Sequence, residues 1–210
     1  ILNVEHLSHG FGDRAIFQNV SFRLLKGEHI GLVGANGEGE STFMNIITGK
    51  LMPDEGKIEW SKNVQVGYLD QHTVLEKGQS VRDVLASAFD SLYAWETRMN
   101  EICDLLGTAD ENEMETYMEE LGTIQDLLTA HDFYLIDSKV EEVANALGLT
   151  EIGIDRDVTE LSGGQRTKVL LGKLLLSKPD ILLLDEPTIY LDVVHIEWLK
   201  RYLSDYENAF

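Results

Sequence analysis

The sequence predicts an α/β fold: a mostly parallel core sheet flanked by helices, with an antiparallel β sub-domain and an acidic helical sub-domain. Three observations carry this prediction. Short aliphatic runs typical of buried strands begin at His29, Val64 and Asp180. The first of these runs leads through a glycine-rich loop into a helix. The middle of the chain is acidic, and its apolar residues recur at helical spacing.

Composition narrows the class of protein. With 210 residues, the chain is long enough for one domain that carries a sub-domain. Its formal net charge of -20 disfavours non-specific attraction to nucleic acid or to an anionic membrane. No apolar run approaches the roughly 18 residues of a membrane span, so we expect no insertion into a membrane. The single cysteine, Cys103, fits a reducing compartment, and we expect a cytoplasmic protein.

The first part of the chain predicts antiparallel strands. The segments "ILNVEHL", from Ile1, and "AIFQNVSFRLL", from Ala15, are separated by Gly10 and Gly12, which favour a turn. A second turn at Pro53–Gly56 precedes a short strand, "KIEW".

The middle of the chain predicts helices. From Ser80 to Glu142, the chain has 16 acidic and 3 basic residues, so this stretch has a net charge of -13. A solvated acidic face is the simpler interpretation of this charge, and a docking surface is the alternative. The apolar residues spaced by three and four are Val81, Val84, Leu85, Ala88 and Leu92, and then Leu121, Ile124, Leu127 and Leu128.

Residues 34–42, "GANGEGEST", have the pattern of a phosphate-binding loop with one exception. Gly34, Gly39 and Ser41 fit the template G-x-x-x-x-G-K-[ST], but Glu40 stands at the lysine position. Glycines let backbone N–H groups surround phosphate oxygens, and the following helix N-terminus adds partial positive charge. The Ser41 hydroxyl would be a magnesium ligand. An ordinary strand-to-helix turn is the structural alternative.

A second motif lies at the end of a predicted buried strand. Four aliphatic residues, Ile181 to Leu184, lead into Asp185 and Glu186. Asp185 would hold magnesium directly or through water, and Glu186 would polarise the attacking water. A solvated acidic strand end is the alternative, and the phosphate-binding pattern upstream argues against it.

The third motif is "LSGGQ", residues 161–165, which precedes a helix. Ser162 and Gln165 can form a capping box, which is a purely structural interpretation. Two glycines at a helix start reduce stability, however, so a backbone that a ligand approaches closely explains them better.

These three motifs together resemble the ATP-binding cassette family over essentially the whole chain. The resemblance assigns Ile181–Asp185 to the Walker B strand, with Asp185 on Mg2+, and Glu186 to the catalytic glutamate. It implies a P-loop ATPase that binds MgATP and hydrolyses it. The matching Walker A positions that bind nucleotide are Gly34, Asn36, Gly37, Gly39, Glu40, Ser41 and Thr42.

Four further assignments follow from the same resemblance. Gln71, in "VGYLDQ", matches the Q-loop glutamine that senses Mg2+ and the attacking water. Phe11 stands where the family stacks an aromatic ring on adenine, with a core aromatic as the alternative. Leu191 and Asp192 match the D-loop at the interface between two cassettes. The signature residues that contact ATP held by the opposite cassette are Ser162, Gly163, Gly164 and Gln165.

Within the family, the sequence is similar to the first cassette of subfamily F, whose soluble two-cassette proteins mostly act on the ribosome. "DEPTIYLD" is close to the D-E-P-T-N-x-L-D of that subfamily, and the helical insertion is long. The expected partners are ATP, a second cassette in the same full-length chain or in a homodimer, and the ribosome. Two alternatives stay open: the ATPase subunit of a membrane transporter, and a non-catalytic structural cassette.

The resemblance also divides the chain. Residues 1–78 would be the N-terminal part of the ATP-binding core with its antiparallel sub-domain, and residues 79–160 the helical sub-domain. Residues 161–210 would hold the signature helix and the Walker B part of the core, ending before the family's switch histidine. His195 does not match that histidine.

Two residues depart from the family pattern. Ile189 stands where subfamily F has asparagine, and Glu40 replaces the lysine. At about 4 Å and an effective dielectric constant near 20, one charge pair amounts to roughly 4 kcal/mol, so the reversal of charge predicts weak ATP binding. The fold tolerates Glu40, because a carboxylate at a helix N-terminus is stabilised by about 0.3–1 kcal/mol.

Overall fold

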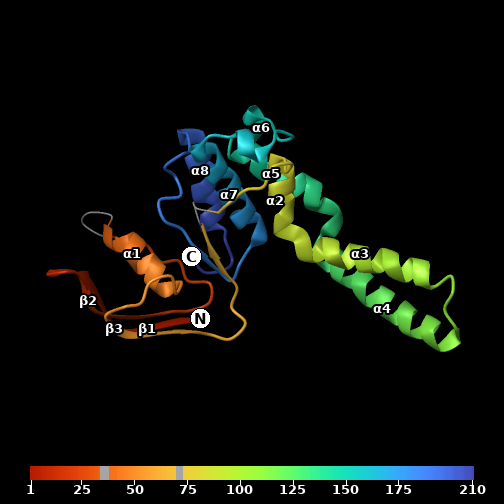
Figure 1. The fold of residues 1–210 in the computed structure, drawn as a ribbon, viewed down its shortest axis with the longest axis horizontal. Coiled ribbons are helices and arrows are strands. Elements are labelled where there is room, and N and C mark those ends of the chain that lie inside the picture. The colour runs from red at the N-terminus through yellow and green to blue at the C-terminus, as the bar shows by residue number, and fades with distance from the viewer. Residues whose placement is uncertain (34–37, 70–72) are drawn as a thin grey trace. The chain divides into compact units, whose positions relative to one another are not determined.

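The computed structural model describes residues 1–33, 38–69 and 73–210 (Figure 1). The chain divides into two compact units: Ile1–Gln71 together with Lys178–Phe210, and His72–Ser177. Within the described ranges, no helix combines the length and the apolar character that crossing a membrane requires.

The first unit contains a three-stranded antiparallel sheet of order β2–β1–β3. β1 spans Leu2–Phe11, β2 spans Arg14–Leu24 and β3 spans Glu55–Trp60. β1 pairs antiparallel with both neighbours, which confirms the strands predicted for this part of the chain.

β1 changes the parity of its buried residues along its length. Leu2 and Val4 are buried at even positions, whereas Leu7 and His9 are buried at odd ones. Between these pairs the register with both neighbouring strands shifts, and His6 has a left-handed φ of 49°. An irregularity of this kind inverts the alternation of the residues that follow. It therefore turns His9, a polar residue, toward the covered face of the sheet.

Helix α1, Glu38–Ile47, packs against this sheet. The ring of Phe43 lies 5.8 Å from that of Phe17 and 5.7 Å from that of Phe22, centroid to centroid, so aromatic contacts join α1 to β2. The Nε1–H of Trp60 donates to the Ile47 carbonyl at 2.9 Å and ties β3 to the end of the helix. The buried core of the unit comprises Leu2, Val4, Leu7, Leu24, Phe43, Ile46, Ile47, Ile181, Leu183 and Ala209.

A parallel pair of strands completes the described sheet structure of this unit. β4, Val66–Tyr68, and β5, Ile181–Leu183, pair in parallel and confirm two of the predicted strands; β5 is buried as predicted, whereas Val66 on β4 is 40% exposed. Ala209 forms a parallel bridge with Ile181 on β5. Helix α8, Val193–Ser204, lies between β5 and this bridge along the chain.

The third predicted strand, from His29, is wrong for the described residues up to Val33, which form no strand. Its backbone pairing extends over a single step: the Ile30 N–H donates to the Phe210 carbonyl at 2.8 Å, and the Phe210 N–H to the Glu28 carbonyl at 3.2 Å. Val33 is 93% exposed. An aliphatic run predicts burial, but a strand also requires a continued ladder of hydrogen bonds, which this segment does not make.

The second unit is helical. The helices predicted from apolar spacing are confirmed, except that the first divides into α2, a 3-10 turn and α3, because Ala88 falls in the turn. Ser80 and Asp83 form a capping box at the start of α2. The elements are α2 Val81–Ala86, η1 Ser87–Phe89, α3 Asp90–Leu105, α4 Glu111–Ala130, η2 Phe133–Leu135, α5 Ile136–Ala146, α6 Leu149–Ile152, η3 Val158–Glu160 and α7 Gly163–Ser177.

Helices α3 and α4 run side by side as a long hairpin (Figure 1). Ile102 on α3 and Ile124 and Leu128 on α4 are buried. The Arg98 guanidinium donates to both carboxylate oxygens of Glu120, at 2.8 and 3.2 Å, and this hydrogen bonding lowers the pKa of Glu120. The four glutamates Glu111, Glu113, Glu115 and Glu119 are exposed, which agrees with a solvated acidic face.

Helix α7 packs against α2 and α5 through a glycine. A Cβ atom on Gly172 would lie 2.8 Å from Leu85 Cδ2, 3.3 Å from Leu147 Cδ1 and 3.4 Å from Val143 Cγ1. Because α7 packs in this way, it belongs to the helical unit. The sequence division at residue 160 had grouped it with the core.

Two glycines within helices of this unit predict opposite responses to substitution. A Cβ on Gly122, within α4, meets no atom within 4 Å, so Gly122→Ala should stabilise by about 0.5–1 kcal/mol through helix propensity. Gly172→Val should destabilise by roughly 1–3 kcal/mol, because the side chain overpacks three neighbours. Urea unfolding of both variants measures the difference; equal effects would contradict the packing described for α7.

Candidate functional site

The start of helix α1 and the end of strand β5 meet in a hydrogen bond. Ser41 lies in the first turn of α1, and Asp185 follows β5. The Ser41 hydroxyl donates to Asp185 Oδ2 at 2.6 Å, although 144 positions separate the two residues. Ile181 and Leu183 anchor β5 in the same core that holds the buried face of α1. The packing of the unit therefore brings this hydroxyl and this carboxylate together.

The two oxygens fit a magnesium ion. Mg2+ prefers oxygen ligands at about 2.0–2.1 Å in an octahedron, so two adjacent ligands lie about 3 Å apart. The Ser41 and Asp185 oxygens, at 2.6 Å, are close to that spacing. No cluster of three or more His, Cys, Asp or Glu residues suited to a metal occurs in the described ranges.

Glu186 is held in an unusual backbone conformation. Its φ is 45°, in the left-handed region that residues with a Cβ rarely occupy, and its side chain is exposed. The Ile189 N–H donates to the Glu186 carbonyl at 3.3 Å and closes a turn there. Backbone strain of this kind collects at functional sites.

Glu40 lies in the first turn of α1, directly before Ser41, and is partly buried. The buried Thr42 follows, and a Cβ on Gly39 would lie 3.2 Å from Ile16 Cγ2, so this turn sits close to β2. Four predicted site residues lie outside the described residues: Gly34, Asn36, Gly37 and Gln71. Contacts of Glu40 with the backbone N–H groups of this loop are therefore not described either.

Phe11 ends β1 and is 56% exposed, which excludes the alternative of a core aromatic. Its ring meets that of His9 edge to face, at 5.1 Å between centroids and an interplanar angle of 88°. His9 is 7% exposed. The break in the alternation of β1, visible only with the register known, gives His9 this buried position.

The signature segment lies in the second unit and starts α7. The Ser162 N–H donates to Gln165 Oε1 at 3.0 Å and the Gln165 N–H to Ser162 Oγ at 3.2 Å, which confirms the capping box. A Cβ added to Gly163 would meet no atom within 4 Å. Among the described residues of the second unit, no atom therefore requires a glycine at this helix start.

The two D-loop residues differ in burial, because the side chain of Asp192 is exposed and that of Leu191 is not. Leu191 is buried, whereas Ile189 is 59% exposed, so its apolar side chain does not join the core of this unit. Asp192 occupies the N-cap position of α8 without a capping hydrogen bond from its side chain. His195 Nδ1 is 4.0 Å from Asp192 Oδ2.

Sequence comparison identifies relatives of the whole chain. It is 75% identical over 210 residues to the uncharacterized ABC transporter ATP-binding protein YfmM of Bacillus subtilis (strain 168), and covers 40% of that protein. It is 35% identical over 196 residues, 93% of the chain, to the energy-dependent translational throttle protein EttA of Escherichia coli (strain K12), of which it covers 35%. The chain thus spans well under half of the relatives it matches.

Comparison with solved structures shows the fold. A structure described as the ATP binding subunit of an ABC transporter matches all of the chain and 77% of its own length, with a TM-score of 0.61 and 20% identity. A metal-chelate type ABC transporter in an inward-facing conformation gives a TM-score of 0.56. The family model described as ABC transporter matches residues 17–189. The α/β fold predicted from the sequence is confirmed, and the chain belongs to the ATP-binding cassette family.

Proposed function

We propose that this chain is a cassette that binds MgATP and hydrolyses it to ADP and phosphate as one half of a head-to-tail cassette pair. The observation that carries the proposal is the 2.6 Å hydrogen bond between Ser41 and Asp185. It unites the start of a phosphate-binding helix with the acidic end of a buried strand. Family membership, generally associated with ATPase activity, supports the same reaction.

Each predicted site residue would have a distinct role in the binding and hydrolysis of MgATP. Ser41 and Asp185 would hold Mg2+, which neutralises charge on the terminal phosphates when bound. Glu186 would accept a proton from the attacking water, and Gln71 would orient that water. The backbone of the loop from Gly34 to Gly39 and the N-terminus of α1 would surround the phosphates.

In this proposal, Glu40 weakens the binding of MgATP to the chain. The phosphate site normally presents a cation from that position, and a carboxylate one residue before Ser41 repels the same phosphates. The fold does not oppose the substitution, because α1 begins with a favourable charge for its dipole. A non-catalytic cassette is the corresponding second candidate, and Glu40 is the observation that favours it.

Reversal of the charge tests the enzyme function. Glu40→Lys, introduced in the full-length protein, should tighten MgATP binding on the order of 100-fold, because about 2.7 kcal/mol of the charge difference survives screening. Isothermal titration and phosphate release measure affinity and turnover.

Glu40→Gln is the control, since it removes the repulsion without supplying a cation, and it should give an intermediate affinity. If Glu40→Lys restores neither binding nor turnover, the loop is not a phosphate site and the non-catalytic candidate stands.

The pairing of cassettes generates a separate prediction. We propose that Gly163 leaves room for the triphosphate of an opposing cassette, because no described atom of its own chain occupies that space. In a Glu40→Lys background, Gly163→Ala should lower turnover at least 10-fold while leaving the unfolding midpoint unchanged or raised. Gly122→Ala is the matched control, as it adds the same methyl group in open space and should leave turnover unaffected. Loss of stability in Gly163→Ala would contradict the proposal.

The biological partner we propose is the ribosome, as for subfamily F. The similarity to a protein named as a translational throttle supports this choice over a transporter subunit. With a charge of -20, this chain is poorly suited to contact RNA directly, so such contacts would lie in the rest of the full-length protein. Co-sedimentation of the full-length protein with 70S ribosomes, in ATP and the Glu40→Lys background, should recover it in the pellet. Recovery with membranes instead would favour the transporter alternative.

A further inference from the structure

The side chain of Phe11 packs against an unusual neighbour, the buried imidazole of His9. The imidazole is 7% exposed, and neither ring nitrogen has a hydrogen-bond partner among the described residues. A buried polar group without such a partner reduces stability. Phenylalanine or leucine would fill the position without this penalty, so a role beyond packing explains the histidine better.

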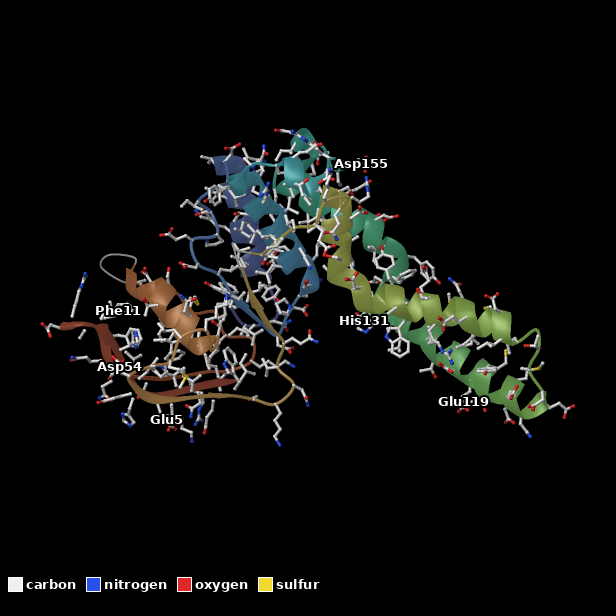
Figure 2. All side chains as sticks on the ribbon, viewed as in Figure 1. Glu5, Phe11, Asp54, Glu119, His131 and Asp155 are labelled. Carbon is white, nitrogen blue, oxygen red and sulfur yellow. The ribbon has the colours of Figure 1, made fainter. Side chains whose placement is uncertain are left out.

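Asp54 holds the segment of β1 that leads to Phe11. Its N–H donates to the Ser8 carbonyl at 3.0 Å, and its Oδ2 accepts from the Gly10 N–H at 3.0 Å. Its Oδ1 lies 3.5 Å from His9 Nδ1. One residue of the turn before β3 thus contacts three consecutive residues, and Phe11 is the next. Figure 2 labels Phe11 and Asp54 at the same end of the sheet.

His9 also joins Phe11 to the phosphate-binding helix. Ring centroids lie 5.1 Å apart from Phe11 to His9, 6.4 Å from His9 to Phe17, and 5.8 Å from Phe17 to Phe43 on α1. This row of rings connects an exposed aromatic face to the helix that carries Ser41. β1 also approaches β2 closely just before Phe11, because a Cβ on Gly10 would lie 2.5 Å from the Arg14 carbonyl oxygen.

We infer that His9 and Asp54 are positioning residues that fix the Phe11 ring as a stacking platform for the base of the bound nucleotide. This inference rests on the proposed function. The perpendicular contact with the His9 ring supports Phe11, and Asp54 holds the backbone of Ser8 and Gly10 on either side of His9. The exposed face of Phe11 then stacks on an aromatic base, at a set distance from the phosphates. Stacking of this kind recognises the presence of a base and discriminates little among bases.

The test compares a ligand that has a base with one that lacks it. In full-length Glu40→Lys protein, the affinities for MgATP and for magnesium tripolyphosphate are measured by titration. His9→Ala should weaken MgATP binding roughly 5- to 10-fold, the range expected for losing one aromatic pair, and leave tripolyphosphate within about 2-fold. His9→Phe, which keeps a ring edge against Phe11, should restore most of the affinity.

Asp54 has a matched control in the next residue. Asp54→Asn should weaken MgATP binding about 3-fold without affecting tripolyphosphate, whereas Glu55→Gln, an equal loss of charge at an exposed neighbour, should change neither. A parallel loss of both ligands in His9→Ala or Asp54→Asn would reveal a general structural defect and overturn the inference. An unchanged MgATP affinity in Phe11→Ala would overturn it as well, while the proposed ATP site would stand.

A measurement without nucleotide separates this inference from the proposed function. In protein labelled with fluorophenylalanine, the 19F resonance of Phe11, assigned through Phe11→Leu, should shift and sharpen in His9→Ala as the ring gains freedom. If Glu40→Lys bound no ATP, the proposed function would fail, yet this resonance would still report whether His9 holds Phe11. An identical resonance in both proteins would overturn the positioning role.

Discussion

The site depends on the hydrogen bond between Ser41 and Asp185, because it is where two distant parts of the chain meet. The contact exists only if α1 and β5 are seated on the same core, through residues such as Phe43 and Ile181. The core thus does more than stabilise the unit: it sets the separation of two oxygens to within a few tenths of an ångström of the spacing that suits Mg2+.

The same helix start shows why folding and function can diverge at one residue. At the first turn of α1, a carboxylate gains about 0.3–1 kcal/mol from the helix dipole. Against a phosphate at about 4 Å it loses roughly 4 kcal/mol per unit charge at an effective dielectric constant near 20. Only the repulsion between Glu40 and phosphate requires the ligand, so the unliganded chain retains its fold with Glu40. Selection for folding alone would therefore not favour lysine over glutamate at position 40.

Most elements could be predicted from the sequence, and the exceptions share a physical cause. Periodicity identified α4, which has a single buried face, and turn residues identified the antiparallel strands. It failed for the segment after His29, where the hydrogen-bond ladder, and not composition, decides whether a strand forms. The Walker B carboxylate was predicted from its strand, but the burial of His9 was not. That burial follows from a register shift in β1, which no local pattern encodes.

The glycines of α7 distinguish constraints inside the chain from constraints outside it. Gly172 has an internal reason, since Leu85, Leu147 and Val143 fill the space of its missing side chain. Gly163 has none within the described residues, although glycine at a helix start lowers stability. Under the proposed pairing, nucleotide held by a second cassette would approach Gly163, and that approach would explain a glycine that relieves no contact within its own unit.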